Sequence, residues 1–210
     1  MTIHVFWDNS NIFGRASGAA ADLEPNVPWI ALRVYWRNLF ELVSQGRDAG
    51  VKVLAGAIPP ACADLWPYAE NLGFDVRLLR SAEVASGRLA EQGVDELLHL
   101  AMANTLLDHP GPDTMVLLSG DGSGSEGGSS FPSQLRRALE RGWSVEVYAW
   151  ESGFSHKGFD PLINDFPERC RVVFLEEYYD STTFVKEGVY YLPHTGTEIA
   201  LAGRVVRPLP

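Results

Sequence analysis

The sequence has only two cysteines, Cys62 and Cys170, among its 210 residues. So few thiols argue against a disulfide framework, and no group of histidines and cysteines has the spacing of a zinc site. Both cysteines are therefore expected to be small buried hydrophobic residues in a reducing compartment, which favours the cytoplasm.

Long apolar runs are also missing, so no segment is expected to cross a membrane. The N-terminus lacks a basic region followed by an apolar stretch, and we expect no signal peptide. No serine lies in a G-x-S-x-G turn, which leaves a serine hydrolase triad without support. The hydrophobic share of 46% and the charged share of 21% are typical of a soluble globular protein.

Basic residues are scarce, because 17 Lys and Arg face 27 Asp and Glu, and the net charge is −10. This balance argues against a surface that coats nucleic acid through clustered cations. It is compatible with an enzyme that meets nucleic acid at one metal-filled cleft, where the bound cations set the local charge.

Strand-like and helix-like segments alternate along most of the chain, which predicts a mostly parallel sheet with helices on both faces. The predicted strands are Ile3–Trp7, Val51–Ile58, Phe74–Leu79, Thr114–Leu118, Ser144–Trp150 and Arg171–Leu175. The predicted helices are Pro28–Gln45, Ala61–Leu72, Val94–Leu107, Pro132–Arg141 and a short one near Pro161–Phe166.

The alternation stops after residue 176, so we expect a main domain over 1–176 and a C-terminal extension over 177–210. The extension has aromatic residues, Thr and Gly but no long helix, and Gly188–Leu192 and Thr197–Val206 read as short strands. It is interpreted as a β-rich segment that either packs on the main domain or forms a homo-oligomer contact.

Three acidic residues are expected at one edge of the sheet. Asp8 follows the first strand, Asp121 follows Thr114–Leu118, and Asp95 opens the helix Val94–Leu107. Ligands of open α/β sheets bind at the carboxyl ends of the strands. Converging carboxylates repel one another unless a cation is present, and oxygen ligands suit Mg²⁺ or Mn²⁺. Such a site can activate water for phosphodiester cleavage.

The same positions carry a resemblance to a known family. Trp7-Asp8-Asn9-Ser10-Asn11, Gly93-Val94-Asp95 and Leu117-Leu118-Ser119-Gly120-Asp121-Gly122 occur in order, and Arg141–Val147 resembles the segment that leads into the next strand. With these motifs, the chain resembles the NYN domains (the LabA/DUF88-like group) of the PIN-like nuclease superfamily.

The resemblance implies a Rossmann-like three-layer α/β/α fold and a metal-dependent endoribonuclease. Asp8, Asp95 and Asp121 match the catalytic metal ligands, and Asn11 and Ser119 match positions that support the first and third acids. RNA as partner, rather than DNA, rests on this likeness alone. Near the motifs, the cations Arg80, Arg88 and Lys157 are candidates for binding substrate phosphates.

Two positions depart from the family pattern. Gln92 stands where the family often has Lys, and Ser123 stands where it usually carries a second Asp after Ser-Gly-Asp-Gly. Glu126, in the inserted stretch 123–130, is a candidate to supply the missing metal-binding acid, and a solvated loop residue is the alternative.

Two other functions therefore stay open beside the nuclease. The missing acid and the acidic composition favour a catalytically weak or inactive module that binds RNA or protein. The run Gly122–Gly127 has the letters of G-x-G-x-x-G, but a dinucleotide fingerprint needs the helix to begin at the glycines. The stretch 128–130 intervenes here, which makes nucleotide binding the weakest of the three.

Overall fold

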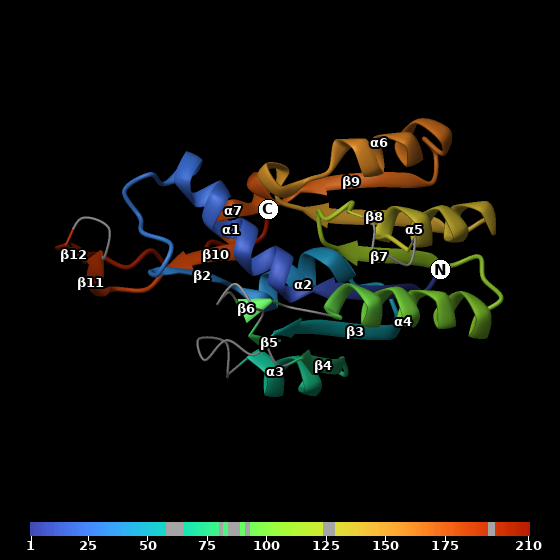
Figure 1. The fold of residues 1–210 in the computed structure, drawn as a ribbon, viewed down its shortest axis with the longest axis horizontal. Helices are drawn as coiled ribbons and strands as arrows, with labels where there is room; N and C mark the ends of the chain where they lie inside the picture. The colour runs from blue at the N-terminus through green and yellow to red at the C-terminus, as the bar shows by residue number, and fades with distance from the viewer. Residues whose placement is uncertain (58–64, 80–81, 84–88, 91–92, 124–128, 193–195) are drawn as a thin grey trace.

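Six parallel strands form the central sheet of the computed structural model. The structure describes residues 1–57, 65–79, 82–83, 89–90, 93–123, 129–192 and 196–210. The six strands are β1 (Ile3–Asp8), β3 (Ala49–Ala57), β4 (Asp75–Leu79), β7 (Thr114–Leu118), β8 (Ser144–Ala149) and β9 (Cys170–Phe174). They lie side by side in the order β4-β3-β1-β7-β8-β9 (Figure 1).

Helices and short strands connect and cover this sheet. The helices are α1 (Asn9–Leu23), α2 (Trp36–Ser44), α3 (Leu65–Asn71), α4 (Val94–Asp108), α5 (Phe131–Glu140), α6 (His156–Asp165) and α7 (Tyr179–Thr182), with 3-10 turns η2 (Glu151–Gly153) and η3 (Leu175–Tyr178). The remaining strands are β2 (Leu32–Val34), β5 (Ala82–Glu83), β6 (Leu89–Ala90), β10 (Thr183–Val185), β11 (Gly188–Leu192) and β12 (Thr197–Leu201).

Alternate residues of the strands build two separate cores. On β1, Val5 and Trp7 belong to one core with α1 and α2, whereas Phe6 belongs to the other with α4, α5 and α6. Successive side chains of a strand point to opposite faces, so a strand buried on both faces is apolar along most of its length. The result is the expected three-layer α/β/α arrangement.

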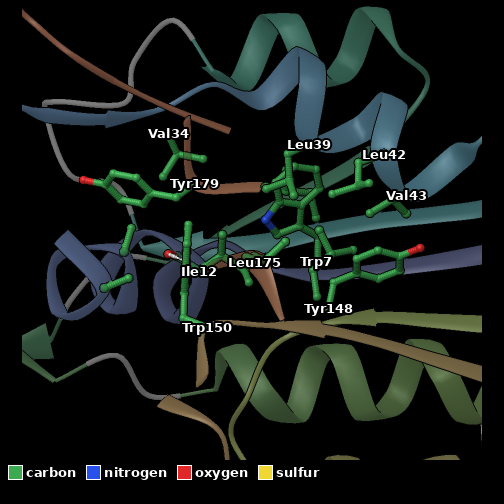
Figure 2. Packing of buried hydrophobic residues seen from close by; sticks show 14 of the residues in the cluster. Trp7, Ile12, Val34, Leu39, Leu42, Val43, Tyr148, Trp150, Leu175 and Tyr179 are labelled. Carbon is green, nitrogen blue, oxygen red and sulfur yellow. Dashed lines mark hydrogen bonds between the residues drawn. The ribbon is translucent and has the colours of Figure 1, made fainter. Parts of the chain in front are cut away.

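The core on the α1 and α2 face is rich in aromatic residues. Figure 2 shows Trp7 beside Leu39 of α2, and Trp150 beside Ile12 of α1. The indole Nε1 of Trp150 donates to the backbone oxygen of Ile12 at 2.9 Å. This bond fixes the start of α1 against the segment that follows β8.

The predicted alternation is confirmed: the six predicted strands of the sheet lie within two residues of the observed bounds, and the helices Val94–Leu107 and Pro132–Arg141 lie within one. Thr114–Leu118 is reproduced without change, and Val94–Leu107 ends one residue further on. The short helix near Pro161–Phe166 begins earlier, at His156, and contains Pro161 in its interior. The first residues of the predicted helix Ala61–Leu72 lie outside the described part of the chain.

The prediction of a helix over Pro28–Gln45 is wrong in its first half. Leu32–Val34 forms β2, which pairs antiparallel with β10, and the helix starts only at Trp36. The backbone N–H of Tyr35 also donates to the carbonyl of Thr182 at 2.7 Å. A contact with residues far along the chain thus overrides the local helical pattern.

Part of the C-terminal segment packs against earlier residues. Apart from the β2–β10 pair, the guanidinium of Arg204 donates to both carboxylate oxygens of Glu24, each at 2.9 Å. β11 and β12 form an antiparallel hairpin at the end of the molecule away from the N-terminus (Figure 1). β11 has the predicted bounds, and β12 ends at Leu201, five residues before the predicted end.

No helix in the described ranges combines the length and the apolar character that a membrane span requires.

Candidate active site

The topology brings three acids to the carboxyl edge of the sheet. Asp8 is the last residue of β1, and Asp121 follows β7, the strand that pairs with β1. α4 packs against β1 and β3, and Asp95 lies in its first turn. Gly93 precedes α4 with a φ of 93°, a backbone conformation that favours glycine. The glycine of Gly93-Val94-Asp95 therefore lets the helix begin where Asp95 faces this edge.

Asp8 is buried and fully engaged at the start of α1. Only 4% of the residue is exposed. Its Oδ1 accepts the backbone N–H of Asn11 at 3.0 Å, which makes Asp8 the N-cap of α1. Its Oδ2 accepts the hydroxyl of Ser119 at 3.0 Å. The carboxylate is thus held in one orientation by two elements.

The surroundings of Asp8 disfavour its negative charge. Burial is the largest cause that raises the pKa of Asp8, and the charges of Asp95 and Asp121 raise it further. The hydrogen bonds from Asn11 and Ser119 act in the opposite direction, yet the pKa reaches about 7. A buried acid with a strongly shifted pKa beside like charges is typical of a functional site.

Ser119 and Asn11 connect the first acid with the third. The Ser119 hydroxyl, which donates to Asp8, also accepts the backbone N–H of Asp121 at 3.2 Å. The side-chain oxygen of Asn11 accepts the N–H of Gly120 at 3.0 Å. The start of α1 and the loop after β7 are therefore joined, which holds the backbone of Asp121 close to Asp8.

Two glycines of Ser-Gly-Asp-Gly are required by close packing. A Cβ on Gly120 would lie 2.6 Å from the carbonyl oxygen of Gly153, and one on Gly122 would lie 2.5 Å from the Ser155 hydroxyl. The N–H of Ser155 donates to the carbonyl of Gly120 at 3.0 Å. The loop that carries Asp121 is thus pressed against the segment between β8 and α6.

The oxygen donors have the chemistry of a site for a hard divalent cation. Within the described ranges, however, no three His, Cys, Asp or Glu side chains are grouped so that they could hold a metal ion. The backbone N–H of Ser123 donates to Oδ1 of Asp121 at 2.8 Å. One oxygen of Asp121 is therefore already engaged by the loop that follows it.

Three of the predicted site residues, Glu126, Arg80 and Arg88, lie outside the described residues. Lys157 is described, and it lines a groove of about 590 Å³ that also includes Asp121. The structure therefore brings Lys157 to the side of the third acid.

Sequence reasoning missed two residues at this edge. Arg15, on the unpredicted helix α1, lines the same groove. His99 lies one turn after Asp95 on α4 and is 4% exposed, and neither of its ring nitrogens has a hydrogen-bond partner among the described residues. Burial lowers the pKa of His99, against the opposite effect of Glu96 and Asp121. The i to i+4 spacing from Asp95 was the available signal for His99.

Comparison with known proteins agrees with this architecture. A solved structure of a protein of unknown function, VPA0982 from Vibrio parahaemolyticus RIMD 2210633, is similar with a TM-score of 0.54 and 14% sequence identity. The similarity covers 83% of this chain and 94% of that chain, and at this identity it shows the fold alone. No curated protein matches the chain.

The family model of the NYN domain matches residues 2–168, which include all three acids. NYN domains have a PIN-like nuclease-type fold, generally bind RNA, and belong with nucleases that generally use divalent metal ions. Because the match covers most of its length, the chain belongs to the NYN domain family.

Proposed function

We propose that the protein is a metal-dependent endoribonuclease whose catalytic centre consists of Asp8, Asp95 and Asp121. The observation that carries the proposal is the position of Asp8. A buried carboxylate is kept beside two other acids at the carboxyl edge of the sheet, although this raises its pKa to about 7. A buried charge beside like charges destabilises the folded protein, and a bound cation would offset that cost.

The proposed metal ligands are the carboxylates of Asp8, Asp95 and Asp121, with Mg²⁺ or Mn²⁺ as the ion. When bound, the ion would neutralise the acids and lower the pKa of a water molecule for attack on a phosphodiester. The protein's own part is orientation. Ser119 and the N–H of Asn11 fix the two oxygens of Asp8, and Ser119 also holds the backbone of Asp121.

The other predicted site residues keep their proposed roles. Lys157 is a candidate for binding substrate phosphate, since it lines the groove beside Asp121. Arg80 and Arg88 are proposed for the same task, and Glu126 for the fourth acid, on sequence grounds alone. The cytoplasm is the proposed compartment, in keeping with two cysteines of which Cys170 is free and buried.

The decisive experiment compares Asp8→Asn with the unmodified protein on a mixed-sequence RNA in Mg²⁺ and in Mn²⁺. The variant keeps an oxygen that can cap α1, so it should fold, and it should not cleave. Asp22→Asn, an exposed acid on the same helix, is the matched control and should cleave normally. Full activity of folded Asp8→Asn would overturn the proposal.

One observation favours a second function, an RNA- or protein-binding module with weak or no catalysis. Ser123 replaces the second acid of the family motif, and its N–H occupies one oxygen of Asp121. A Mn²⁺ titration separates the two functions. A thermal shift with Mn²⁺ together with cleavage supports the nuclease, whereas neither shift nor cleavage supports the binding module. The same oligonucleotide made as DNA tests whether RNA is the preferred substrate.

A further inference from the structure

A groove leads away from Asp121 between α1 and the segment that joins β8 to α6. It has a volume of about 590 Å³, and its walls include Arg15, Ser152, Ser155 and Lys157. Asp121 and the groove therefore share one surface. A nucleic-acid strand cleaved at the three acids would place its neighbouring nucleotides beside the groove.

The two cations of the groove have no acidic partner within the described ranges, although this protein carries a net charge of −10. Both Arg15 and Lys157 are exposed. Every other arginine in the described ranges donates a side-chain hydrogen bond or forms an ion pair. Arg15 is thus the described arginine whose five donors are left for a ligand.

Uncharged groups in the groove also suit an anion. The first turn of α6, a helix of ten residues, lines the groove through Lys157 and Gly158. The N–H of Gly158 already donates to the carbonyl of Ser155 at 2.9 Å, so the contribution of α6 is the positive end of its helix dipole, which attracts anions. Ser155 precedes the helix without donating or accepting a side-chain cap bond, so its hydroxyl is not committed there. Glycines make up much of the remaining wall, which lets a ligand approach the backbone.

Arg15 is held across the groove by a glycine. A Cβ on Gly153 would lie 2.6 Å from Cγ and 2.7 Å from Cδ of Arg15. The stem of Arg15 therefore rests on the bare backbone of η2, where any side chain would displace it. A glycine at position 153 therefore leaves room for the Arg15 side chain on this wall of the groove.

From these features we propose that the groove binds the backbone phosphates that adjoin the cleaved one on an RNA strand, with Arg15 and Lys157 as the main contacts. The inference rests on the proposed nuclease function and adds the path of the substrate. Arginine suits this role because its planar fork donates two parallel hydrogen bonds to a phosphate. Contacts of this kind position a strand without reading its bases.

The test measures binding of a fluorescein-labelled, mixed-sequence single-stranded RNA by anisotropy in Mg²⁺, with Asp8→Asn as the uncleaving background. Arg15→Ala and Lys157→Ala should each raise Kd about tenfold and lower the slope of log Kd against log salt by about 0.7, the value for one phosphate contact on a single strand. Lys186→Ala removes an exposed cation outside the groove and should change neither quantity.

A second pair of variants tests the position of Arg15 without removing charge. Gly153→Ala should weaken binding several-fold, because the new methyl group displaces the Arg15 stem. Gly14→Ala adds the same group on α1 where nothing lies within 4 Å, and it should bind like the background. Unchanged Kd and salt slope in both charge variants would overturn the proposal.

Cleavage by the protein with native Asp8 keeps the two proposals apart. Cleavage with unchanged binding in the groove variants leaves the nuclease standing and removes the groove as the RNA path. Loss of binding without any cleavage supports the groove and removes the nuclease. If AMP competes as tightly as the RNA, the occupant is a single nucleotide and the proposed strand path is wrong.

Discussion

Two buried carboxylates of this protein have opposite surroundings. Glu146, on β8, is 7% exposed and receives two hydrogen bonds of 2.8 Å from Arg47, one on each oxygen. Arg171 forms a second ion pair with it at 2.9 Å. Burial alone would raise the pKa of Glu146, but the two arginines hold it below its usual value. Asp8 is slightly more buried, with 4% exposed, and its charged neighbours are the acids Asp95 and Asp121.

The difference separates a structural acid from a candidate functional one. The negative charge of Glu146 is balanced by Arg47 and Arg171, so the fold requires no added cation there. Asp8 is compensated only by two uncharged hydrogen-bond donors, so its charge is costly until a cation arrives. Because both carboxylates belong to the same sheet, they can be compared in one protein under one set of conditions.

The largest change in the free energy of unfolding is expected from removing the charge of Asp8, measured in EDTA so that no divalent cation is bound. The pKa of Asp8 in the folded protein, about 7, lies well above the ordinary aspartate value of 3.8. The folded state therefore binds the proton more tightly, and stability falls as pH rises from about 4 to about 7. Asp8→Asn should remove this loss and stabilise the protein at pH 8 by up to about 4 kcal/mol, at about 1.4 kcal/mol per unit of pKa.

Urea unfolding of Asp8→Asn and the unmodified protein at pH 4 and pH 8 measures this effect. The two proteins should differ little at the acid end and most at the alkaline end. Asp22→Asn should leave the pH profile as it is. A variant that is less stable at pH 8 would show that the charge of Asp8 is satisfied by the fold.

Glu146→Gln tests the other side of the comparison. The variant keeps the shape but leaves Arg47, whose side chain is 26% exposed, without its counterion. Removal of one partner from a buried pair should destabilise the protein by about 3 kcal/mol at pH 7. Glu41→Gln breaks the exposed pair with Arg37 and should cost less than about 0.5 kcal/mol. Equal losses in the two variants would contradict the distinction between them.

A bound divalent cation should balance the charge of Asp8, as the two arginines balance the charge of Glu146. Mn²⁺ at a hundred times its Kd should stabilise the unmodified protein by about 2.7 kcal/mol, since a ligand of the folded state adds RT ln(1 + [L]/Kd). The gain should be largest above pH 7, where Asp8 is ionised, and should be absent in Asp8→Asn. Thermal unfolding with and without Mn²⁺ measures it. An equal gain in Asp8→Asn would place the ion elsewhere.

Sequence patterns predicted the sheet better than the helices around it. β1 and β7 are buried on both faces, so their apolar runs end where the strands end. α1 was missed because Ala16, Ala19 and Ala20 form its buried face, and such small residues make a weak apolar stripe. β2 was missed because its partner, β10, lies about 150 residues further on.

The candidate site was predicted in part for the same reason. Asp8, Asp95 and Asp121 follow or open elements that the apolar pattern marks clearly. Arg15 was not predicted because its helix, α1, was not predicted. The bonds that link Ser119 with both acids depend on how two loops pack, and no local spacing encodes that contact.

The smallest predicted effect concerns His99, which lies near the acids and has no hydrogen-bond partner among the described residues. Burial lowers the pKa of His99, so the unfolded chain binds its proton more readily, and stability falls as pH drops below about 6.5. This direction is opposite to that of Asp8. His99→Leu should reduce the loss between pH 6.5 and pH 5 by up to about 1.4 kcal/mol per pH unit.

His4 is the matched control for His99, because it is also buried but has partners on both ring nitrogens, Asp113 at 3.4 Å and the N–H of Val51 at 3.2 Å. Replacing His4 by Leu should destabilise the protein at every pH, since it leaves those partners unsatisfied. Replacing His99 by Leu should not destabilise the protein at any pH. If His99→Leu is instead less stable at pH 8, the neutral imidazole forms a stabilising hydrogen bond in the folded protein. His99 would then be a fourth polar group that acts together with the three carboxylates of the candidate site.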